Sequence, residues 1–486
     1  MRIVLLFLLG SALAAQPADL AEKARLARDL VVAGKSEQAI PIYEELVRAF
    51  PNDAGIIMNL AIADFKMKRY RDTIQQAERA LQLQPELASA NLFLGASWIE
   101  LHEPARAVTP LEKVIAAQPN DRNARLMLAD ALFDLGKYED STRHFQEVSG
   151  QAPDSSRAWY GLARSYDALG SRARQQLENG ASAYALALSA EDYRKQRRYG
   201  SAHTNYRQAL AKQPVLPGLH AGLAAVYRSL GHPDWAAEEE QQEAKIPPCP
   251  DGSLACDFRA GRYAEIIQAA RADNTPEPLY WLVKSYEELA RQAYDRLSRL
   301  PPSLERHLHA ARSYDTGGQP LEAAKEWREA LKLSPENREI QTALVWSLFK
   351  GGDCENLLPL AGQLLDQQPD SRDLNFLVGA SLLTVGRPEK AVGHLENSIR
   401  QDSQFLPAHA VLGRALLRAG KATEAIPHLK AALTIDEDGS GHFQLLRAYQ
   451  ITGQTDLARH ALAEYQAFQK LVEARARFED GTAITR

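Results

Sequence analysis

Three cysteines are the residues best placed to do covalent chemistry. Cys249 and Cys256 lie seven positions apart around Pro250-Asp251-Gly252, a turn that can bring two sulfur atoms together. The spacing predicts a local disulfide and leaves Cys354 as a free thiol. Neither a CxxC pair nor a nearby pair of histidines completes a set of four zinc ligands, so the sequence predicts no metal site and no cofactor.

Other short motifs that support catalysis are incomplete in this chain. Gly34-Lys35-Ser36 resembles the end of a phosphate-binding loop, but Asp29 stands where that loop requires a glycine. His307 and His309 are two positions apart, so they point to different sides of a helix and cannot hold one metal ion together. We therefore expect a protein that is not an enzyme.

Prolines recur at a fixed interval of 34 residues. The interval separates Pro51, Pro85, Pro119 and Pro153, then Pro214 and Pro248, and again Pro301, Pro335 and Pro369. Proline lacks an N–H and clashes with the preceding turn, so regular prolines mark regular helix ends. Between them, apolar residues such as Leu128, Ala129 and Leu132 recur at spacings of three and four, which is one face of a helix.

The repeat resembles the tetratricopeptide repeat, whose pattern is W-x2-L-G-x2-Y, then A-x3-F, then P. The matching sets are Trp159, Leu162, Ala163 and Tyr166 for a first helix; Ala202, Tyr206, Ala209 and Pro214 for a second; and Leu412, Gly413, Leu416, Gly420, Ala425, Leu429 and Ala432 for both. The resemblance covers roughly residues 20–470 and implies an all-α fold, a right-handed α-solenoid of about a dozen antiparallel helix pairs. Small residues such as Gly95, Gly379 and Gly413 are expected to let the two helices of a pair approach closely.

The period slips in irregular units near residues 156–180 and 249–301. Ser165-Tyr166 and Ser285-Tyr286 occupy corresponding places, which indicates an internal duplication that inserts a long or bent helix. Tyr280–Leu300 contains no Gly or Pro and predicts a continuous helix. The expected organisation is a signal peptide (1–15), an N-terminal array (20–248), a short irregular unit or joint (249–276), a C-terminal array (277–470) and a frayed tail (471–486). The joint reads either as a hinge or as a loop made rigid by its disulfide.

The first fifteen residues have the pattern of a cleaved secretory signal. Arg2 is followed by an apolar run from Ile3, and Ala12-Leu13-Ala14 fits the small-x-small rule, so cleavage is expected after Ala14 or Ala15. No later stretch of 18 apolar residues predicts a membrane span. The net charge of −5 argues against nucleic acid as a partner. We expect an exported protein, periplasmic or secreted, of undetermined oligomeric state.

The resemblance implies a concave groove that binds partner proteins or extended peptides and is lined by the first helix of each pair. Its lining positions are the second, fifth, ninth and twelfth of each unit. Carried onto this sequence, with Asn59 added from the family's carboxylate clamp, they give Arg28, Met58, Asn59, Ile62, Phe65, Leu92, Leu126 and Phe133 in the N-terminal array, and Arg312, Trp346, Phe349, Phe376, Arg414, Phe443 and Arg447 in the C-terminal array. The alternative is that the apolar members are core residues.

The two candidate grooves differ in chemistry. The N-terminal set is largely apolar, and Ala24 and Phe93 stand where the clamp requires cations, which argues against a complete clamp there. The C-terminal set mixes aromatic residues with arginine, and this composition suits an acidic or carboxylate-bearing segment. We therefore expect a non-catalytic scaffold or adaptor of the cell envelope. Alternatives are an accessory protein for export of carbohydrate or another polymer, and a repeat module associated with a transferase.

Overall fold

Every regular element in the described part of the chain is a helix. The computed structural model describes residues 18–178, 180–246, 249, 253–482 and 484, and these contain 26 α-helices, one short 3₁₀ helix and no strand. The predicted all-α solenoid is therefore confirmed. The chain divides into unit 1, the described residues of Met1–Ala173 and Leu282–Pro301, and unit 2, those of Arg174–Trp281 and Pro302–Arg486. These units do not follow the expected array boundaries.

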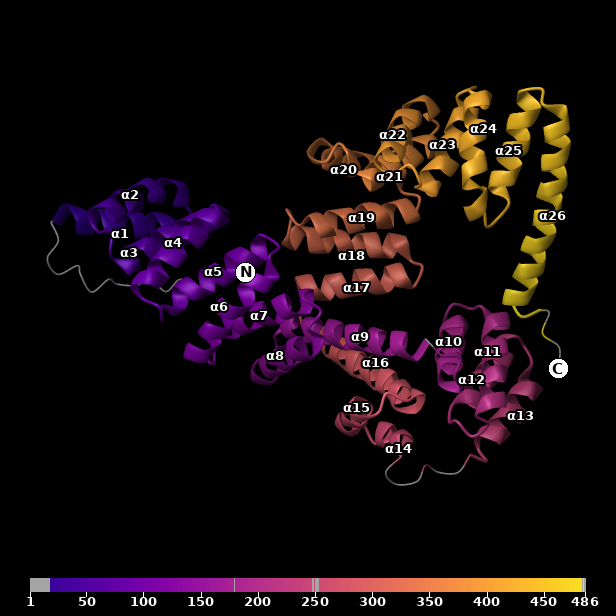
Figure 1. Ribbon diagram of the computed structural model, residues 1–486, viewed down its shortest axis with the longest axis horizontal. Helices are drawn as coiled ribbons and strands as arrows, with labels where there is room; N and C mark the ends of the chain where they lie inside the picture. Colours follow the sequence, from indigo (N-terminus) through magenta and orange to yellow (C-terminus); the bar gives the residue numbers. More distant parts are fainter. Residues whose placement is uncertain (1–17, 179, 247–248, 250–252, 483, 485–486) are drawn as a thin grey trace. The chain divides into compact units, whose positions relative to one another are not determined.

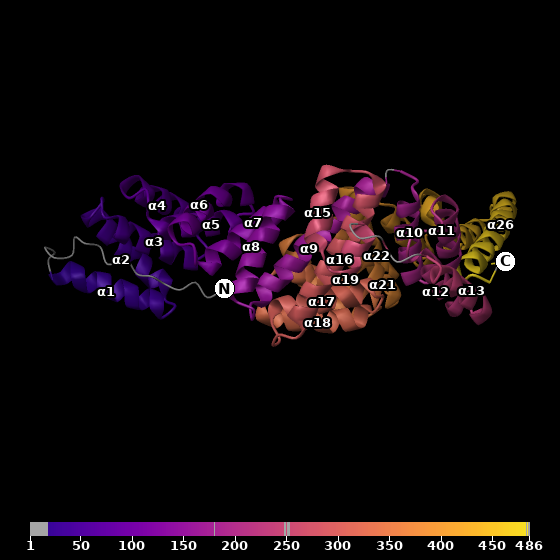
Figure 2. The ribbon, with the colours of Figure 1, turned by 90° about the horizontal axis from the view of Figure 1, so that it is seen from below.

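Unit 1 is a stack of consecutive antiparallel helix pairs (Figures 1 and 2). The pairs are α1 (Ala18–Val32) with α2 (Ser36–Ala49), α3 (Ala54–Lys66) with α4 (Tyr70–Leu83), α5 (Ala88–Glu100) with α6 (Pro104–Ala117), and α7 (Arg122–Asp134) with α8 (Tyr138–Gln151). One apolar core runs through the stack from Ala27 to Leu132. Most of α9 (Ser156–Glu178) and of α16 (Pro276–Ser298) completes the unit.

Unit 2 contains the remaining helices, with a second apolar core that runs from Ala311 to Ala461. Its helices are α10 (Ala183–Lys195), α11 (Tyr199–Lys212), α12 (Leu219–Ser229), α13 (Pro233–Glu243), α14 (Leu254–Arg259), α15 (Tyr263–Ala272), α17 (Leu304–Thr316), α18 (Pro320–Leu333), α19 (Arg338–Lys350), α20 (Cys354–Gln367), α21 (Arg372–Thr384), α22 (Pro388–Gln401), α23 (Leu406–Arg418), α24 (Ala422–Ala432), the 3₁₀ helix (Leu433–Ile435), α25 (Ser440–Ile451) and α26 (Thr455–Glu479).

The turn inside each pair places one residue in the left-handed backbone region. Gly136 and Gly386 meet this requirement with φ of 72° and 76°. Lys68 and His102 occupy equivalent places, 34 residues apart, with φ of 59°. Because a side chain is disfavoured there, these two turns must be held by the packing of their helices.

The predicted close approach of paired helices is present. A Cβ atom added to Gly95 would lie 2.7 Å from Leu111 Cγ, and one added to Gly379 would lie 2.6 Å from Leu395 Cγ. Both leucines are fully buried on the second helix of the pair. The glycines are therefore required by the interhelical distance.

The two irregular units each contain a helix of 23 residues, α9 and α16. The expected continuous helix is thus confirmed for α16, although it begins at Pro276 and ends at Ser298, before Leu300. Where both belong to unit 1, the two helices lie side by side (Figures 1 and 2): the Tyr166 ring stacks on Tyr286 with centroids 6.1 Å apart, and the Tyr294 hydroxyl donates to Asp167 at 2.7 Å. Ser165-Tyr166 and Ser285-Tyr286 correspond in sequence. The two segments that pack against each other are therefore the two copies of the duplicated segment.

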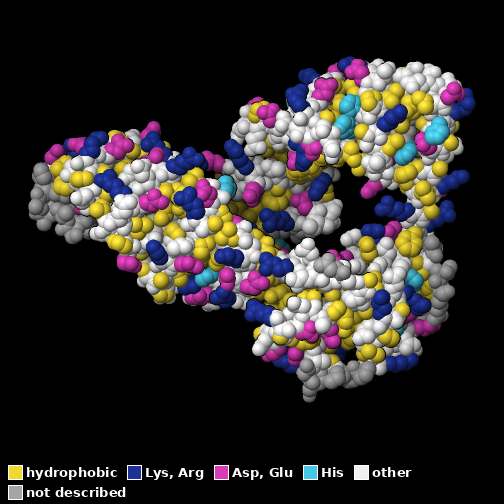
Figure 3. Space-filling view, in the orientation of Figure 1, with side chains coloured by type: hydrophobic (Ala, Val, Ile, Leu, Met, Phe, Trp, Pro, Cys, Tyr) yellow, Lys and Arg dark blue, Asp and Glu magenta, His cyan; other side chains and the backbone are white. Residues whose placement is uncertain are grey.

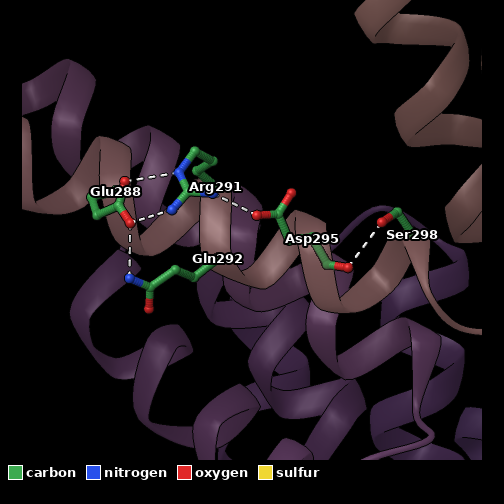
Figure 4. Close-up of polar contacts among 5 residues, drawn as sticks. All are labelled: Glu288, Arg291, Gln292, Asp295 and Ser298. Carbon is green, nitrogen blue, oxygen red and sulfur yellow. Dashed lines mark hydrogen bonds and ion pairs between the residues drawn. The ribbon is translucent and has the colours of Figure 1, made fainter.

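Polar side chains along α16 support its length (Figure 4). Arg291 donates to Glu288 at 2.8 Å and to Asp295 at 2.6 Å, while Gln292 donates to Glu288 at 2.9 Å. These pairs are three and four positions apart, the spacing at which charged residues stabilise an exposed helix. The hydrogen bonds from Arg291 hold the pKa of Glu288 below its ordinary value.

The cysteine prediction is confirmed. Cys249 and Cys256 form a disulfide with Cα atoms 5.5 Å apart, and Cys354 is free and buried. The predicted signal peptide lies outside the described residues, as do Pro250, Asp251 and Gly252 of the predicted joint. In the described part of the chain, no helix is long and apolar enough to cross a bilayer.

The C-terminal end differs from the expected frayed tail. Helix α26 continues past residue 471 to Glu479 as a single helix of 25 residues. Its sequence contains no Gly or Pro and is rich in Ala, Glu and Arg, which have high helix propensity. The loss of apolar periodicity after Leu471 therefore marks the end of packing against α25 and not the end of the helix.

Candidate partner-binding surface

Four aromatic side chains form a continuous row across successive first helices of unit 2. Ring centroids are 6.1 Å apart for Trp346 and Phe349, 5.7 Å for Phe349 and Phe376, and 5.3 Å for Phe376 and Phe405. The contacts are edge to face, the arrangement that aromatic pairs prefer. Trp346, Phe349 and Phe405 are half-buried, whereas Phe376 is buried between its neighbours. We call these four residues the aromatic row.

A cation lies at one end of the aromatic row. The Arg372 guanidinium lies 4.5 Å from the centroid of Phe405. Its nitrogens also contact Asp373 at 2.8 Å and Asp402 at 3.1 Å. These two carboxylates, through hydrogen bonds, raise the pKa of Arg372, so the group stays charged. The row therefore combines accessible aromatic surface with a guanidinium that two carboxylates hold in place and whose charge they offset.

Arg414 lies further along unit 2, in a small cavity. The cavity has a volume of about 290 Å³ and is lined by α23, α24 and the loop before α25. Arg414 shares it with Asp436, Glu437 and Asp438, so its charge is opposed locally. The Asp436 carboxylate already has hydrogen-bond partners. It accepts from the backbone N–H of His442 at 3.0 Å and contacts His442 Nδ1 at 2.6 Å.

Unit 1 has a second accessible aromatic–arginine contact. The Arg164 guanidinium lies over the Phe133 ring at 4.0 Å, and Arg164 Nε has no hydrogen-bond partner in the described chain. Nearby, Arg157 donates to Asp130 through two nitrogens, at 3.0 and 2.5 Å. The predicted residue Phe133 thus lies beside charged groups and not in a purely apolar groove.

Several predicted residues of the N-terminal array are core residues. Met58 is 0% exposed, Ile62 2% and Leu126 7%, so they cannot contact a partner on the surface. Their assignment to a groove is wrong, because Met58 and Ile62 belong to the apolar core of unit 1 and Leu126 is buried as well. In unit 2 the same correction applies to Phe376, which is buried. It supports the aromatic row by packing against the rings of Phe349 and Phe405.

The remaining predicted residues stay accessible but are not all brought together. Arg28, Asn59, Phe65 and Leu92 are half-buried, and Arg312, Arg414, Phe443 and Arg447 are exposed. Phe65 packs against Phe93 with centroids 5.3 Å apart, and Phe443 packs against Tyr465 at 5.7 Å. Phe65 also contacts Tyr70, with ring centroids 5.5 Å apart, so it too lies in a cluster of three rings. In the described chain, the cluster of Trp346, Phe349 and Phe376 differs in joining more than one predicted residue.

The sequence prediction missed Phe405, Arg372, Arg157 and Arg164. Phe405 precedes α23 as its N-cap residue and lies outside the four positions assigned to the groove. Arg157 and Arg164 occupy the second and ninth positions of α9, so the groove spacing would have found them. They were missed because the groove positions were not applied to the irregular unit.

Histidines provide interhelical hydrogen bonds in several repeats. His409 Nδ1 and His428 Nδ1 are 2.9 Å apart, and His394 Nδ1 lies 3.1 Å from Asn375 Oδ1. Both pairs join residues 19 positions apart, so they recur at one place in the repeat. Burial, assisted at His428 by the neighbouring His409, lowers the pKa of His394 and His428. No group of three or more His, Cys, Asp or Glu in the described residues has metal-binding geometry.

Paired helices, period-34 turns and side-chain clusters on the first helices define a helical repeat protein. Three family models described as tetratricopeptide repeat match the chain, at residues 263–438, at residues 99–164, and at residues 24–63 with 187–253. The chain belongs to the tetratricopeptide repeat family. Proteins with this fold are typically non-catalytic scaffolds that bind proteins or peptides.

Similarity to individual proteins is confined to parts of the chain. The Hsp70-Hsp90 organizing protein of Triticum aestivum is 29% identical over 20% of this chain and 17% of its own length. Lipopolysaccharide assembly protein B of Haemophilus influenzae is 27% identical over 27% of this chain and 34% of its own. The chain therefore matches about a third or less of the length of these relatives. A solved tetratricopeptide repeat protein from Parabacteroides merdae is 12% identical, covering 68% of this chain and all of that one, with a TM-score of 0.35.

Proposed function

We propose that the protein is an exported, non-catalytic scaffold that binds an extended, acidic segment of a partner protein along the aromatic row of unit 2. The observation that carries the proposal is the connected set Trp346, Phe349, Phe376 and Phe405 with Arg372 at its end. Trp and Arg are the residue types that supply most binding energy at protein interfaces. Half-buried aromatic rings lose little conformational freedom when a partner covers them.

The charge distribution supports an acidic segment rather than a polyanion. On the visible face of the molecule, Lys and Arg side chains are interspersed with Asp and Glu (Figure 3). A nucleic-acid binder requires a continuous basic surface that neutralises many phosphates. Two exposed arginines near the first-helix face of unit 2, Arg312 and Arg447, supply local positive charge for a carboxylate-bearing chain.

Replacement of Trp346 by alanine is expected to weaken binding of such a segment. Full-length protein is used to select peptides from a random displayed library, and affinity for the selected peptides is measured by fluorescence anisotropy. We expect acidic peptides with aromatic residues and a loss of about 30-fold in Trp346→Ala, which corresponds to about 2 kcal/mol for a central aromatic residue. The control is Gln363→Ala on α20, an exposed residue of a second helix. Selection of basic peptides, or equal affinity of Trp346→Ala and wild type, would contradict the proposal.

The second candidate is an accessory role in export of a polymer. It is favoured by the partial match to lipopolysaccharide assembly protein B. The aromatic row also offers ring faces on which sugar rings can stack. A neutral glycan that competes with the selected peptides, with an affinity that depends on Trp346 but not on salt, would favour this candidate over the acidic segment.

Export is a separate part of the proposal. It is supported by the signal-like pattern of the first fifteen residues and by the Cys249–Cys256 disulfide, a bond that persists in oxidising compartments. N-terminal sequencing of the protein from its native host is expected to begin at Ala15 or Gln16. Recovery of a chain that retains Met1 in the cytoplasmic fraction, with reduced Cys249, would contradict export.

A further inference from the structure

One contact in unit 2 departs from the rule that repeats of a solenoid contact only their neighbours. The last turn of α26 lies against the first turn of α11 (Figure 1), and the residues that meet are 281 positions apart. Both helices belong to unit 2. A terminal helix in such an array normally frays, so this long-range contact needs a specific cause.

The contact is ionic and directional. The Glu479 carboxylate accepts from an Arg198 nitrogen at 2.5 Å and from the Ser201 hydroxyl at 3.0 Å. Arg198 is the N-cap residue of α11 and Ser201 lies in its first turn, where the helix dipole favours a negative charge. Burial acts to raise the pKa of Glu479, but the hydrogen bonds from Arg198 and Ser201 outweigh it and hold that pKa below its ordinary value.

Two glycines make the close approach possible. A Cβ atom on Gly200 would lie 1.8 Å from the carbonyl oxygen of Phe478, so only glycine permits the two backbones to meet. Just beyond α26, a Cβ on Gly481 would lie 2.5 Å from a methyl carbon of Leu230. Gly481 also has φ of 81°, which favours glycine. The end of α26 therefore matches the surface that it contacts in shape as well as in charge.

The segment that carries Glu479 has little support of its own. From Glu473 to Phe478 every side chain is exposed, and Leu471 is 67% exposed. Upstream, Ala458 and Ala461 bury the helix against its partner α25. The final turns of α26 therefore form a strut that is anchored at both ends and unpacked between them.

We propose that residues 470–482 are a latch, which closes unit 2 by docking on the first turn of α11 and releases when the Arg198–Glu479 pair is broken. In the latched state the chain between Arg198 and Glu479 is a closed loop, so the last helix pair cannot move independently of α11. In the released state the strut frays and the C-terminal repeats are free to change curvature. The latch needs no partner, so its test is independent of peptide binding.

Hydrogen exchange of the free, full-length protein tests the latch. Glu479→Gln keeps the shape of the side chain but removes its charge, and we expect amides of residues 472–479 to exchange about tenfold faster or more than in wild type. Rising salt is expected to act in the same direction on wild type, because the pair is only half-buried and screening weakens it. Amides of α23 and α24 report that the array itself remains folded.

Two further variants separate a latch from a general loss of stability. Arg475→Ala changes an exposed arginine of the same strut and is expected to exchange as wild type does. The exchanged pair Arg198→Glu with Glu479→Arg is expected to recover part of the protection that either single change removes. Wild-type protection in Glu479→Gln, or unprotected amides at 472–479 in the wild type, would overturn the proposal.

Discussion

Replacement of Gly161 by alanine is expected to destabilise unit 1 by about 2 kcal/mol. A Cβ atom at this position would lie 2.2 Å from Cζ of Phe145, and the Phe145 ring is 0% exposed in α8. Overpacking a rigid core costs about 1–3 kcal/mol and sometimes more, whereas the gain in helix propensity from Gly to Ala is about 1 kcal/mol. The steric cost is therefore expected to exceed the gain.

The matched control for this change is Gly150→Ala on α8. Gly150 is exposed, lies on the same helix as Phe145, and a Cβ added there would meet no atom within 4 Å. We expect this variant to be as stable as wild type or more stable by less than about 1 kcal/mol. Urea unfolding followed by circular dichroism, with hydrogen exchange to locate the loss in α8 and α9, measures both. Equal stability of the two variants would show that α8 and α9 are further apart than the structure places them.

The success of the sequence in predicting the fold has a local cause. Pro at helix ends, Gly in the left-handed turn and small residues at Gly95 or Gly379 each act within one 34-residue unit. Because each of these residues acts within its own unit, the same residue types recur in most units. The sequence therefore shows the pattern of paired helices many times. The pairing of helices could be predicted for this reason without any knowledge of contacts between distant residues.

The candidate surface was predictable only in part, because exposure depends on more than one repeat. Trp346 and Ile62 both hold the ninth position of a first helix, yet the first is half-buried and the second is only 2% exposed. The difference arises from the side chains of the neighbouring pairs, which spacing alone does not describe. Phe405 was missed because it is a helix-cap residue and lies outside the assigned groove positions. The contact between α26 and α11 was missed because its residues are 281 positions apart and do not belong to neighbouring repeats.

Asp64→Asn is expected to stabilise unit 1 at neutral pH and to have little effect in acid. Asp64 is 4% exposed in α3, and the nearest cation, Arg69, lies 4.0 Å away. Burial above all, together with Asp72 and Glu44 and against the opposing effect of Arg69, raises the pKa of Asp64 to about 6. Because an unfolded aspartate has a pKa of about 3.9, the folded state holds the proton more tightly.

The sign of the pH dependence follows from that difference. The stability that protonated Asp64 contributes is fully present below about pH 4 and is lost as the pH rises through about 6, since the buried carboxyl must then ionise. Asparagine carries no charge at any pH, so the variant lacks this loss. At pH 7.5 we expect Asp64→Asn to be more stable than wild type by about 1–3 kcal/mol. The upper value corresponds to a pKa difference of about two between folded and unfolded states, at about 1.36 kcal/mol per pKa unit, and hydrogen bonds to the charged carboxylate reduce it.

Urea midpoints at pH 4 and pH 7.5 measure this difference, with hydrogen exchange across α3 and α4 to assign it to unit 1. Glu78→Gln, which removes an exposed carboxylate on the adjoining helix α4, is the matched control and is expected to leave both midpoints unchanged. A variant Asp64→Asn that is destabilised equally at both pH values would mean that the carboxylate makes hydrogen bonds worth more than its burial costs. Greater stability only at pH 7.5 would show that Arg69 does not fully offset the cost of burying the Asp64 carboxylate.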